Sequence, residues 1–402
     1  MKYRLTLPNT HIYSYNMNMA TTVTTSTSWL SRLGSSVKNV FFGFILVIGS
    51  VFLLFWNEGR AIKTYQSLKE GASLVVSISP DSRKTEHEGK LIHFSGDAKT
   101  PSVLTDVDFG VAVNALKLNR IVEVYQWEED SQSTTKEKFG GGTDTTTTYT
   151  YSKKWSDTLI DSSSFQEKEL HQNPSTKRIE NKEWFAENVS VGSYSIPNAL
   201  LASLTGYVPF TITQEMLSSL PYGTQEKLEL EGNMIYYQTE KNSDPSIGDT
   251  RIKYEYIAPQ KLSVISQQSG DSLVPFESKN SRTISMIQLG NHTAKEMFDT
   301  AISSNVTVTW IIRAAGTLVM YIGLSLIFGV LPVVASVIPL FGRLVGAGIS
   351  LIAGLLTLIG ATVTVGIAWI FYRPMIGIVL FLIAAVGIYM IIKSMSRKPA
   401  IK

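Results

Sequence analysis

The chain has 402 residues, of which 44% are hydrophobic and 17% charged, and it contains no cysteine. The absence of cysteine excludes disulfides as a source of stability and excludes a cysteine nucleophile. The formal net charge of +3 is no sign of nucleic-acid binding, because all acidic residues lie between Glu58 and Asp299, where acids outnumber bases, whereas both ends of the chain are basic.

The N-terminal part divides into a polar segment and an apolar run. Residues 1–36 are rich in threonine and serine and cannot bury enough apolar surface to fold alone, so we expect a flexible cytosolic tail there. Residues 40–56 read VFFGFILVIGSVFLLFW, which predicts a first transmembrane helix at residues 37–57. A cleaved signal peptide is the alternative, but this run ends in Phe55 and Trp56 rather than in small residues.

Charged and aromatic residues follow this run closely, as they do at a membrane–water interface. Trp56, Glu58 and Arg60 stand at the boundary, and we interpret Glu58 and Arg60 as an interfacial charge pair rather than as catalytic groups. Residues 61–70 are expected to form a short helix that Gly71 ends.

Residues 58–310 are predicted to form a large β-rich domain outside the cytoplasm. From Leu74 onward, short segments alternate with a period of two and are separated by Gly, Pro, Asn and Asp, which indicates an antiparallel sheet. Within IVEVYQW, for example, Val122 and Val124 would lie on the buried face. The polar residues 128–146, with three consecutive glycines, are typical of the mobile tip of a long hairpin.

A weak internal repeat is visible in this domain at a shift of 143 residues, where Glu88-Gly89 falls on Glu231-Gly232 and Ile92 on Ile235. Two β units of common ancestry, small barrels of the OB type, would explain it. Chance alternation of strands would explain it as well, since any two sheets share a period of two. Two short helices are expected between the halves, near residues 198–204 and 213–220.

The last quarter of the chain supplies three more predicted transmembrane helices. We place them at residues 311–331, within residues 332–372 after a loop, and at residues 373–392, followed by a basic cytosolic tail at residues 393–402. Lys and Arg collect at both ends of the chain, so both termini are predicted to be cytosolic. The fold class is therefore an α+β membrane protein with one N-terminal and three C-terminal spans. Arg313 and Arg373 are expected at the membrane interface.

One face of the third span carries small residues four positions apart, which lets helices approach closely. These residues are Gly342, Gly346, Ser350 and Gly354. They predict helix packing and a homo-oligomer. No acidic residue and no histidine lies within any span, which argues against an ion-coupled transporter.

No motif for chemistry stands out. The five histidines lack the spacing of a zinc site, and there is no G-x-S-x-G elbow of a serine hydrolase. The glycines at residues 140–142 are not followed by the Lys and Ser or Thr of a phosphate-binding loop. We therefore predict no catalytic residue, no metal ion and no cofactor. An enzyme whose site is assembled from distant residues is the weakest alternative.

Several segments of the chain are recognisable in their order and spacing. They are WNEGRAIKTYQSLKEGASLVV, VEVYQWEE, YTYSKKW with HQNPS, SIGDTRIKYEY, QQSGDSLVPF, RAAGTLVMYIGLSL and WIFYRP. Together they resemble the transmembrane protein 43 family, also called LUMA, from about residue 54 to residue 374. The resemblance implies four spans, both termini in the cytosol and a large lumenal or periplasmic domain. It further implies the endoplasmic reticulum or inner nuclear membrane in a eukaryote, the bacterial inner membrane for a bacterial member, and membrane or envelope proteins as partners.

Two hypotheses for function follow. The first is a non-enzymatic scaffold or organiser in the lipid bilayer, which self-associates and presents its β domain to partner proteins. The second is a lipid- or small-ligand-binding protein with an apolar groove in the β domain. That groove would be lined by Tyr194, Leu200, Leu201, Tyr207 and Phe210.

Overall fold

The computed structural model describes residues 20–220, 228–238, 244–373 and Tyr389. Its contacts divide the chain into two units, each assembled from segments that are distant in sequence. The β-rich unit comprises the described residues within 1–24, 69–134 and 146–299. The helical unit comprises the described residues within 25–68, 135–145 and 300–402.

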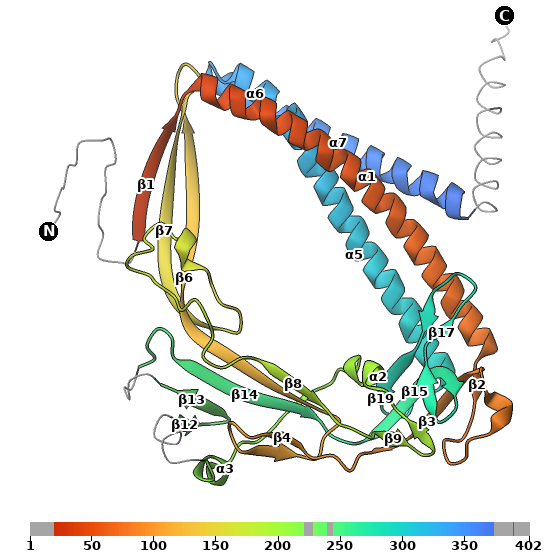
Figure 1. Cartoon of the computed structure of the whole chain (residues 1–402). Helices are drawn as coiled ribbons and strands as arrows, with labels where there is room; N and C mark the ends of the chain where they lie inside the picture. The colour runs from red at the N-terminus through yellow and green to blue at the C-terminus, as the bar shows by residue number, and fades with distance from the viewer. Residues whose placement is uncertain (1–19, 221–227, 239–243, 374–388, 390–402) are drawn as a thin grey trace, which may run out of the picture. The chain divides into compact units, whose positions relative to one another are not determined.

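The helical unit contains residues 29–68 of α1 (Trp29–Leu74), residues 300–328 of α5 (Ala294–Phe328), α6 (Val330–Ala335) and α7 (Pro339–Tyr372) (Figure 1). Three stretches, namely α1, α5 with α6, and α7, are long and apolar enough to cross a membrane, as the sequence predicts. The chain is thus an integral membrane protein by its helices. The fourth predicted span, residues 373–392, falls outside the described residues except for Arg373 and Tyr389.

Helix α1 is longer at both ends than the sequence suggests. Ser28 caps its start, because the backbone N–H of Ser31 donates to Ser28 Oγ at 3.3 Å. Strand β1 (Ala20–Thr27) precedes it, so the flexible tail predicted for residues 1–36 is wrong for residues 20–36. At the other end α1 passes through Gly71 without a break. A Cβ there would lie 2.5 Å from Ile284 Cδ1, so this glycine permits close packing instead of ending the helix.

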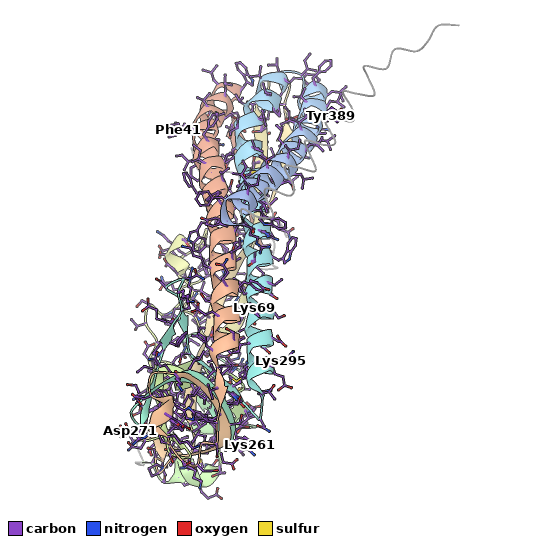
Figure 2. The ribbon with its side chains drawn as sticks, turned by 90° about the vertical axis from the view of Figure 1, so that its right-hand side faces the viewer. Phe41, Lys69, Lys261, Asp271, Lys295 and Tyr389 are labelled. Atoms are coloured by element: carbon purple, nitrogen blue, oxygen red, sulfur yellow. The ribbon has the colours of Figure 1, made fainter. Side chains whose placement is uncertain are left out.

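Helices α1 and α5 run side by side and meet at two glycines (Figure 1, Figure 2). A Cβ on Gly43 would lie 2.6 Å from the carbonyl oxygen of Gly323, and a Cβ on Gly323 would lie 2.9 Å from that of Gly43. Only glycine allows two backbones to come this close. Near this contact the exposed side chains of α1 are apolar, and that of Phe41 is 73% exposed.

The β-rich unit contains two large sheets, which are mainly antiparallel and include one parallel pair of strands. The first has the order β1-β7-β6-β14-β13-β12, with β8 paired to β6 and β11 to β14. Its further strands are β6 (Lys117–Glu137), β7 (Thr143–Ser156), β8 (Lys182–Phe185), β11 (Val208–Pro209), β12 (Leu228–Glu231), β13 (Met234–Tyr237) and β14 (Thr250–Ile257). The ends of β1, β6 and β7 that lie nearest the β6–β7 turn belong to the helical unit.

The second large sheet has the order β10-β9-β3-β15-β16, with β19 paired to β15 and β2 parallel to β3. Its strands are β2 (Val76–Ser77), β3 (Leu91–Lys99), β9 (Ser190–Val191), β10 (Tyr194–Ser195), β15 (Lys261–Ser269), β16 (Ser272–Val274) and β19 (Met286–Leu289). Two small pairs join β4 (Leu104–Asp106) to β5 (Val111–Val113) and β17 (Phe276–Glu277) to β18 (Thr283–Ile284). The short helices α2 (Asn198–Ala202) and α3 (Gln214–Ser218) confirm the two predicted between the halves.

The predicted alternation is confirmed in the central strands. In β6, Val122 and Val124 are buried whereas Glu123 and Tyr125 are partly exposed. The buried faces of both large sheets contribute to one apolar cluster, in which Phe94 of β3 lies with Val122 of β6. This shared core explains why the two sheets form one folding unit.

The strands do not separate into two barrels. Strand β3 of the first predicted half pairs with β15 of the second, and β6 pairs with β14 in the same way. Each large sheet therefore mixes strands from both halves, and the interpretation as two OB-like units is not confirmed.

The hairpin tip is much shorter than the polar segment at residues 128–146 suggests. Strand β6 continues to Glu137 and β7 begins at Thr143, so only residues 138–142 form the turn. Gly140 and Gly141 have φ of +86° and +79°, a backbone region that favours glycine. The threonines on either side of the turn have a high β propensity. Because threonine is also polar, composition alone suggested a loop at these positions.

Candidate functional site

A buried carboxylate joins three helices in the helical unit. Glu58 on α1 is 1% exposed, and its two oxygens accept from Arg313 on α5, Oε1 from Nε at 2.6 Å and Oε2 from Nη2 at 2.8 Å. Oε2 also accepts from Nε1 of Trp369 on α7 at 2.8 Å. A buried carboxylate requires such partners, and the fork of an arginine supplies them with fixed geometry. We refer to Glu58, Arg313 and Trp369 as the helix clamp.

Polar side chains next to the helix clamp tie α1 to α5. Arg60 donates from Nη1 to Asn305 Oδ1 at 3.0 Å and from Nη2 to Thr309 Oγ1 at 2.9 Å. Asn57 donates to the carbonyl oxygen of Thr309 at 3.1 Å, and Asn305 donates to that of Ala61 at 2.9 Å. Asn57 and Asn305 are buried, so these hydrogen bonds satisfy polar groups that would otherwise lose their contacts with water.

The structure gives Glu58 and Arg60, expected as a charge pair, further partners on another helix. Side chains two positions apart on a helix do not face each other, so Arg60 turns to α5 while Glu58 pairs with Arg313. Sequence spacing could not have revealed a partner on another helix. A position at the membrane interface stays a prediction for five residues, namely Trp56, Glu58, Arg60, Arg313 and Arg373.

A cavity of about 150 Å³ opens beside the helix clamp. Its lining comes from α1, α5 and the end of α7: Glu58, Ala61, Tyr65, Asn305, Val306, Thr309, Trp310, Arg313 and Arg373. The guanidinium of Arg313 lies 4.7 Å from the ring centre of Trp310, and that of Arg373 lies 5.4 Å from the ring centre of Trp369. Cations in these positions are attracted to the electron-rich ring faces, which orients both arginines.

A larger apolar groove of about 580 Å³ lies between α5 and α7. Among its lining residues are Ser350 and Gly354 of the predicted helix-packing face, opposite Tyr321 of α5. Gly342 is used differently, because a Cβ there would lie 2.9 Å from Ser336, and Gly346 has only ordinary contact with Pro332 at 3.8 Å. The structure therefore leaves Gly346 and Gly354 without close neighbours within the described chain, and Ser350 donates to the carbonyl oxygen of Gly346 at 3.0 Å.

Comparison with known proteins decides the family. Residues 124–374 match the family model described as Transmembrane protein 43. The chain belongs to the transmembrane protein 43 family. It is 32% identical to human transmembrane protein 43 over 393 residues, covering 93% of this chain and 94% of the human one. It is 31% identical to the rat protein and 29% identical to the transmembrane protein 43 homolog of Drosophila melanogaster, covering 90% and 86% of this chain and 91% of either relative. No solved structure matches the chain.

In this family member the tip of the β6–β7 hairpin contacts the helices. Gly140 N–H donates to the carbonyl oxygen of Val337 at 3.1 Å, between α6 and α7. Glu137 lies 3.6 Å from Arg32 of α1 and 3.9 Å from Arg343 of α7. Arg32 also donates to the carbonyl oxygen of Gly141. We refer to these contacts as the tip joint.

The tip joint conflicts with part of the predicted topology. Arg32 and Arg343 flank spans on the side that the sequence assigns to the cytosol, whereas the sequence assigns residues 137–142 to the opposite side together with the rest of the β domain. Both assignments cannot hold for the hairpin tip. The compartment of each terminus stays a prediction.

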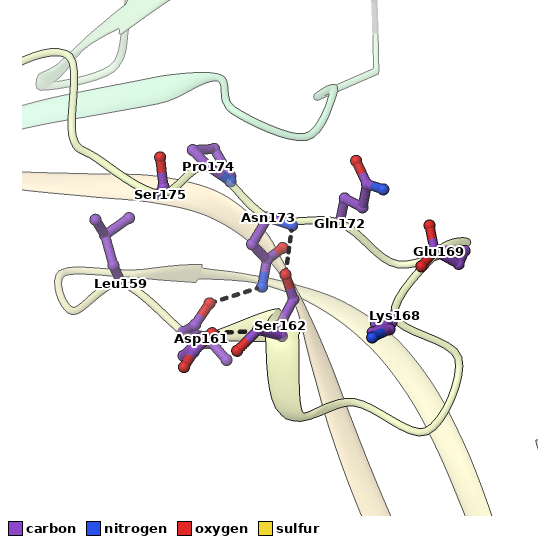
Figure 3. A pocket seen from close by; sticks show the side chains of 11 residues that line it. Leu159, Asp161, Ser162, Lys168, Glu169, Gln172, Asn173, Pro174 and Ser175 are labelled. Carbon is purple, nitrogen blue, oxygen red and sulfur yellow. Dashed lines mark hydrogen bonds between the residues drawn. The ribbon is translucent and has the colours of Figure 1, made fainter.

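The β-rich unit has a polar cavity of about 480 Å³ between residues 159 and 175 (Figure 3). Its polar groups largely bind one another: Asn173 donates to the carbonyl oxygen of Ile160 at 3.2 Å, and its backbone N–H donates to Ser162 Oγ at 2.9 Å. Asp161 accepts from the backbone N–H of Ser163 at 2.9 Å. These groups hold the loop together rather than converge on a space for chemistry.

The groove suggested by the second hypothesis is not found at its expected residues. Tyr194, Leu200, Leu201 and Phe210 all belong to the buried core, with exposures of 8% or less. Tyr207 is partly exposed, and its hydroxyl donates to Glu183. These side chains pack against one another and so cannot line an open groove.

A buried charged cluster in the β-rich unit is also structural. Arg120 donates to Asp106 at 2.7 Å and to Asp108 at 3.1 Å, and the Tyr254 hydroxyl donates to Asp106 at 2.7 Å. Burial, followed by the hydrogen bond to Asp106, raises the pKa of Tyr254 far above its usual range, so this hydroxyl stays protonated. Among the described residues, no group of three His, Cys, Asp or Glu side chains is arranged to hold a metal ion.

Proposed function

We propose that this transmembrane protein 43 family member is a non-enzymatic membrane organiser, which self-associates through its helices and presents its β-rich unit to partner proteins. The observation that carries the proposal is the apolar groove between α5 and α7, at which Ser350 and Gly354 leave room for a helix of a second copy. In a bilayer, exposed apolar side chains alone indicate only contact with lipid, whereas a groove beside small residues favours helix packing.

Two glycines of this face, Gly346 and Gly354, have no close neighbour within the described chain. A Cβ on Gly354 would come no closer than 4.0 Å to Tyr321, in contrast to Gly43 and Gly323, which are required by the contact between α1 and α5. Glycine destabilises a helix by about 1 kcal/mol relative to alanine, and Gly354, unlike the equally open Gly348, lines the groove, which favours a packing role for Gly354.

The partners and the compartment belong to the same proposal. We place the protein in the endoplasmic reticulum or inner nuclear membrane, with membrane or envelope proteins as partners, and the similarity to human, rat and fly proteins supports this over a bacterial inner membrane. A lipid- or ligand-binding groove in the β-rich unit has no support at its expected residues, since that lining is core.

The test is the oligomeric state of the full-length protein in mild detergent, measured by light scattering. Gly346→Leu with Gly354→Leu should convert an oligomer into a monomer, because a leucine at position 354 would fill the groove and one at position 346 would enlarge the same helix face one turn before Ser350. Gly348→Leu is the matched control, since a Cβ at Gly348 meets nothing within 4 Å. A wild-type monomer would reject the proposal. So would an oligomer that survives the double substitution.

A further inference from the structure

The cavity beside the helix clamp lies where the membrane helices change from apolar to polar. The apolar run of α1 ends at Trp56, that of α5 begins directly after Arg313, and that of α7 ends at Tyr372. The contact between Glu58 and Arg313 holds these points of α1 and α5 together. A cavity at such a level faces the headgroup region of a bilayer.

The lining of the cavity has more positive than negative charge. It includes the guanidiniums of Arg313 and Arg373 but a single carboxylate, Glu58, which is already bound to Arg313 and Trp369. Within the described residues no carboxylate lies at ion-pair distance from Arg373, and the sequence contains no Asp or Glu after Asp299. An arginine at a partly closed site without a protein carboxylate calls for an external anion.

The rim of the cavity is apolar and aromatic. Val306 is 50% exposed and Trp310 is 62% exposed, and Ile311, which follows at once on α5, is 62% exposed. An anion that carries hydrocarbon chains could therefore place its charge inside the cavity and its chains along α5. The volume of about 150 Å³ has room for several water-sized groups, which suits one phosphate and excludes a folded peptide.

We propose that this cavity binds the phosphate group of an anionic phospholipid. Arg373, oriented by the ring of Trp369, contacts the phosphate with its guanidinium fork, and Arg313 adds the field of a second cation. The indole of Trp369 is held in turn by Glu58, so the helix clamp positions the lipid site without touching the lipid. The proposal is independent of self-association and of any role of the β-rich unit.

The test compares lipid retention by full-length variants in native mass spectrometry after exchange into micelles with phosphatidylglycerol or phosphatidylcholine. The wild type should retain phosphatidylglycerol selectively. Arg373→Gln should lower that retention about tenfold, the effect of losing one charge-assisted contact, and Arg373→Lys should lower it less. Lys63→Gln removes the same charge from an exposed position of α1 and should leave retention unchanged.

Three results would overturn the proposal. Equal losses in Arg373→Gln and Lys63→Gln would indicate general surface electrostatics rather than a site. Retention that Arg373→Gln does not change would show that the cavity is not used. Displacement of the lipid by inorganic phosphate at equal concentration would show that the site selects a free ion. Because Arg373 is not part of the helix clamp, thermal unfolding of Arg373→Gln should match the wild type, and a matching curve makes each outcome interpretable.

Discussion

Replacing Glu58 by glutamine should destabilise the helical unit more than any surface charge change. The substitution keeps the size of the side chain but leaves the guanidinium of Arg313 without its counter-charge, with 18% of the Arg313 side chain exposed. It also turns an acceptor of Trp369 Nε1 into a weaker, neutral one. The loss therefore reaches α1, α5 and α7 together.

The expected size follows from the burial of the pair. Removing one partner of a buried ion pair costs about 3–5 kcal/mol, and the residual exposure of Arg313 favours the lower end, about 3 kcal/mol. With roughly 2–4 °C of melting temperature for each kcal/mol in a unit of this size, Glu58→Gln should lower the melting temperature by about 6–12 °C. Thermal unfolding of the full-length protein in detergent, followed by circular dichroism, measures this shift.

Two further variants make the result specific. Asp299→Asn breaks the exposed pair with Lys295 on α5 and should leave the melting temperature unchanged, since both side chains are more than half exposed. Glu58→Gln combined with Arg313→Gln removes the unpaired charge and should recover part of the loss. If Glu58→Gln behaves like Asp299→Asn, or if the two losses in the helix clamp simply add, the helix clamp does not hold the helices as described.

Three other predictions concern the helix contact, the hairpin tip and pH. Gly323→Ala should lower the melting temperature by several degrees, because its Cβ would lie 2.8 Å from Val47 Cγ2, whereas Gly366→Ala meets nothing within 4 Å and should not. Phe139→Cys and Leu340→Cys, in a chain free of cysteine, should react with a membrane-impermeant maleimide from the same side of sealed vesicles, and labelling from opposite sides would refute the tip joint. Burial lowers the pKa of His93 below its ordinary 6.5, so as the pH falls the unfolded chain binds a proton at a higher pH than the folded protein does. The free energy of unfolding should therefore fall as the pH drops from about 7.5 to about 5.5. In His93→Gln this fall should be less steep. An identical pH dependence in both proteins would contradict this assignment.

Much of the fold could be predicted because its signals are local. The apolar run before Trp56 and the alternation around Val122 each reflect a periodicity that a single segment contains. The start of α1 also has a local signal, since Ser28 is a good N-cap directly before Trp29. The threonine-rich sequence around it led instead to the prediction of a flexible tail.

The sequence predicted residues of the candidate site but not the contacts between them. Glu58 and Arg313 were both expected near a membrane interface, but 255 positions separate them, and only the packing of α1 against α5 brings them together. The same holds for Gly43 and Gly323. Only the backbone of the opposing helix shows why a side chain would not fit at these positions. The pairing of sheets across the two halves could not be predicted for the same reason, because a period of two does not say which strand is the neighbour.

The hydroxyl pairs along the hairpin set a limit on where lipid can go. Ser133 and Thr147 hydrogen-bond at 2.8 Å, and Thr135 and Thr145 at 3.0 Å, and the two β6 residues of these pairs are exposed. Acyl chains cannot replace the hydrogen bonds that such hydroxyl groups make with water. Any arrangement of copies that carries the tip joint to bilayer depth must therefore cover these strands with protein or water.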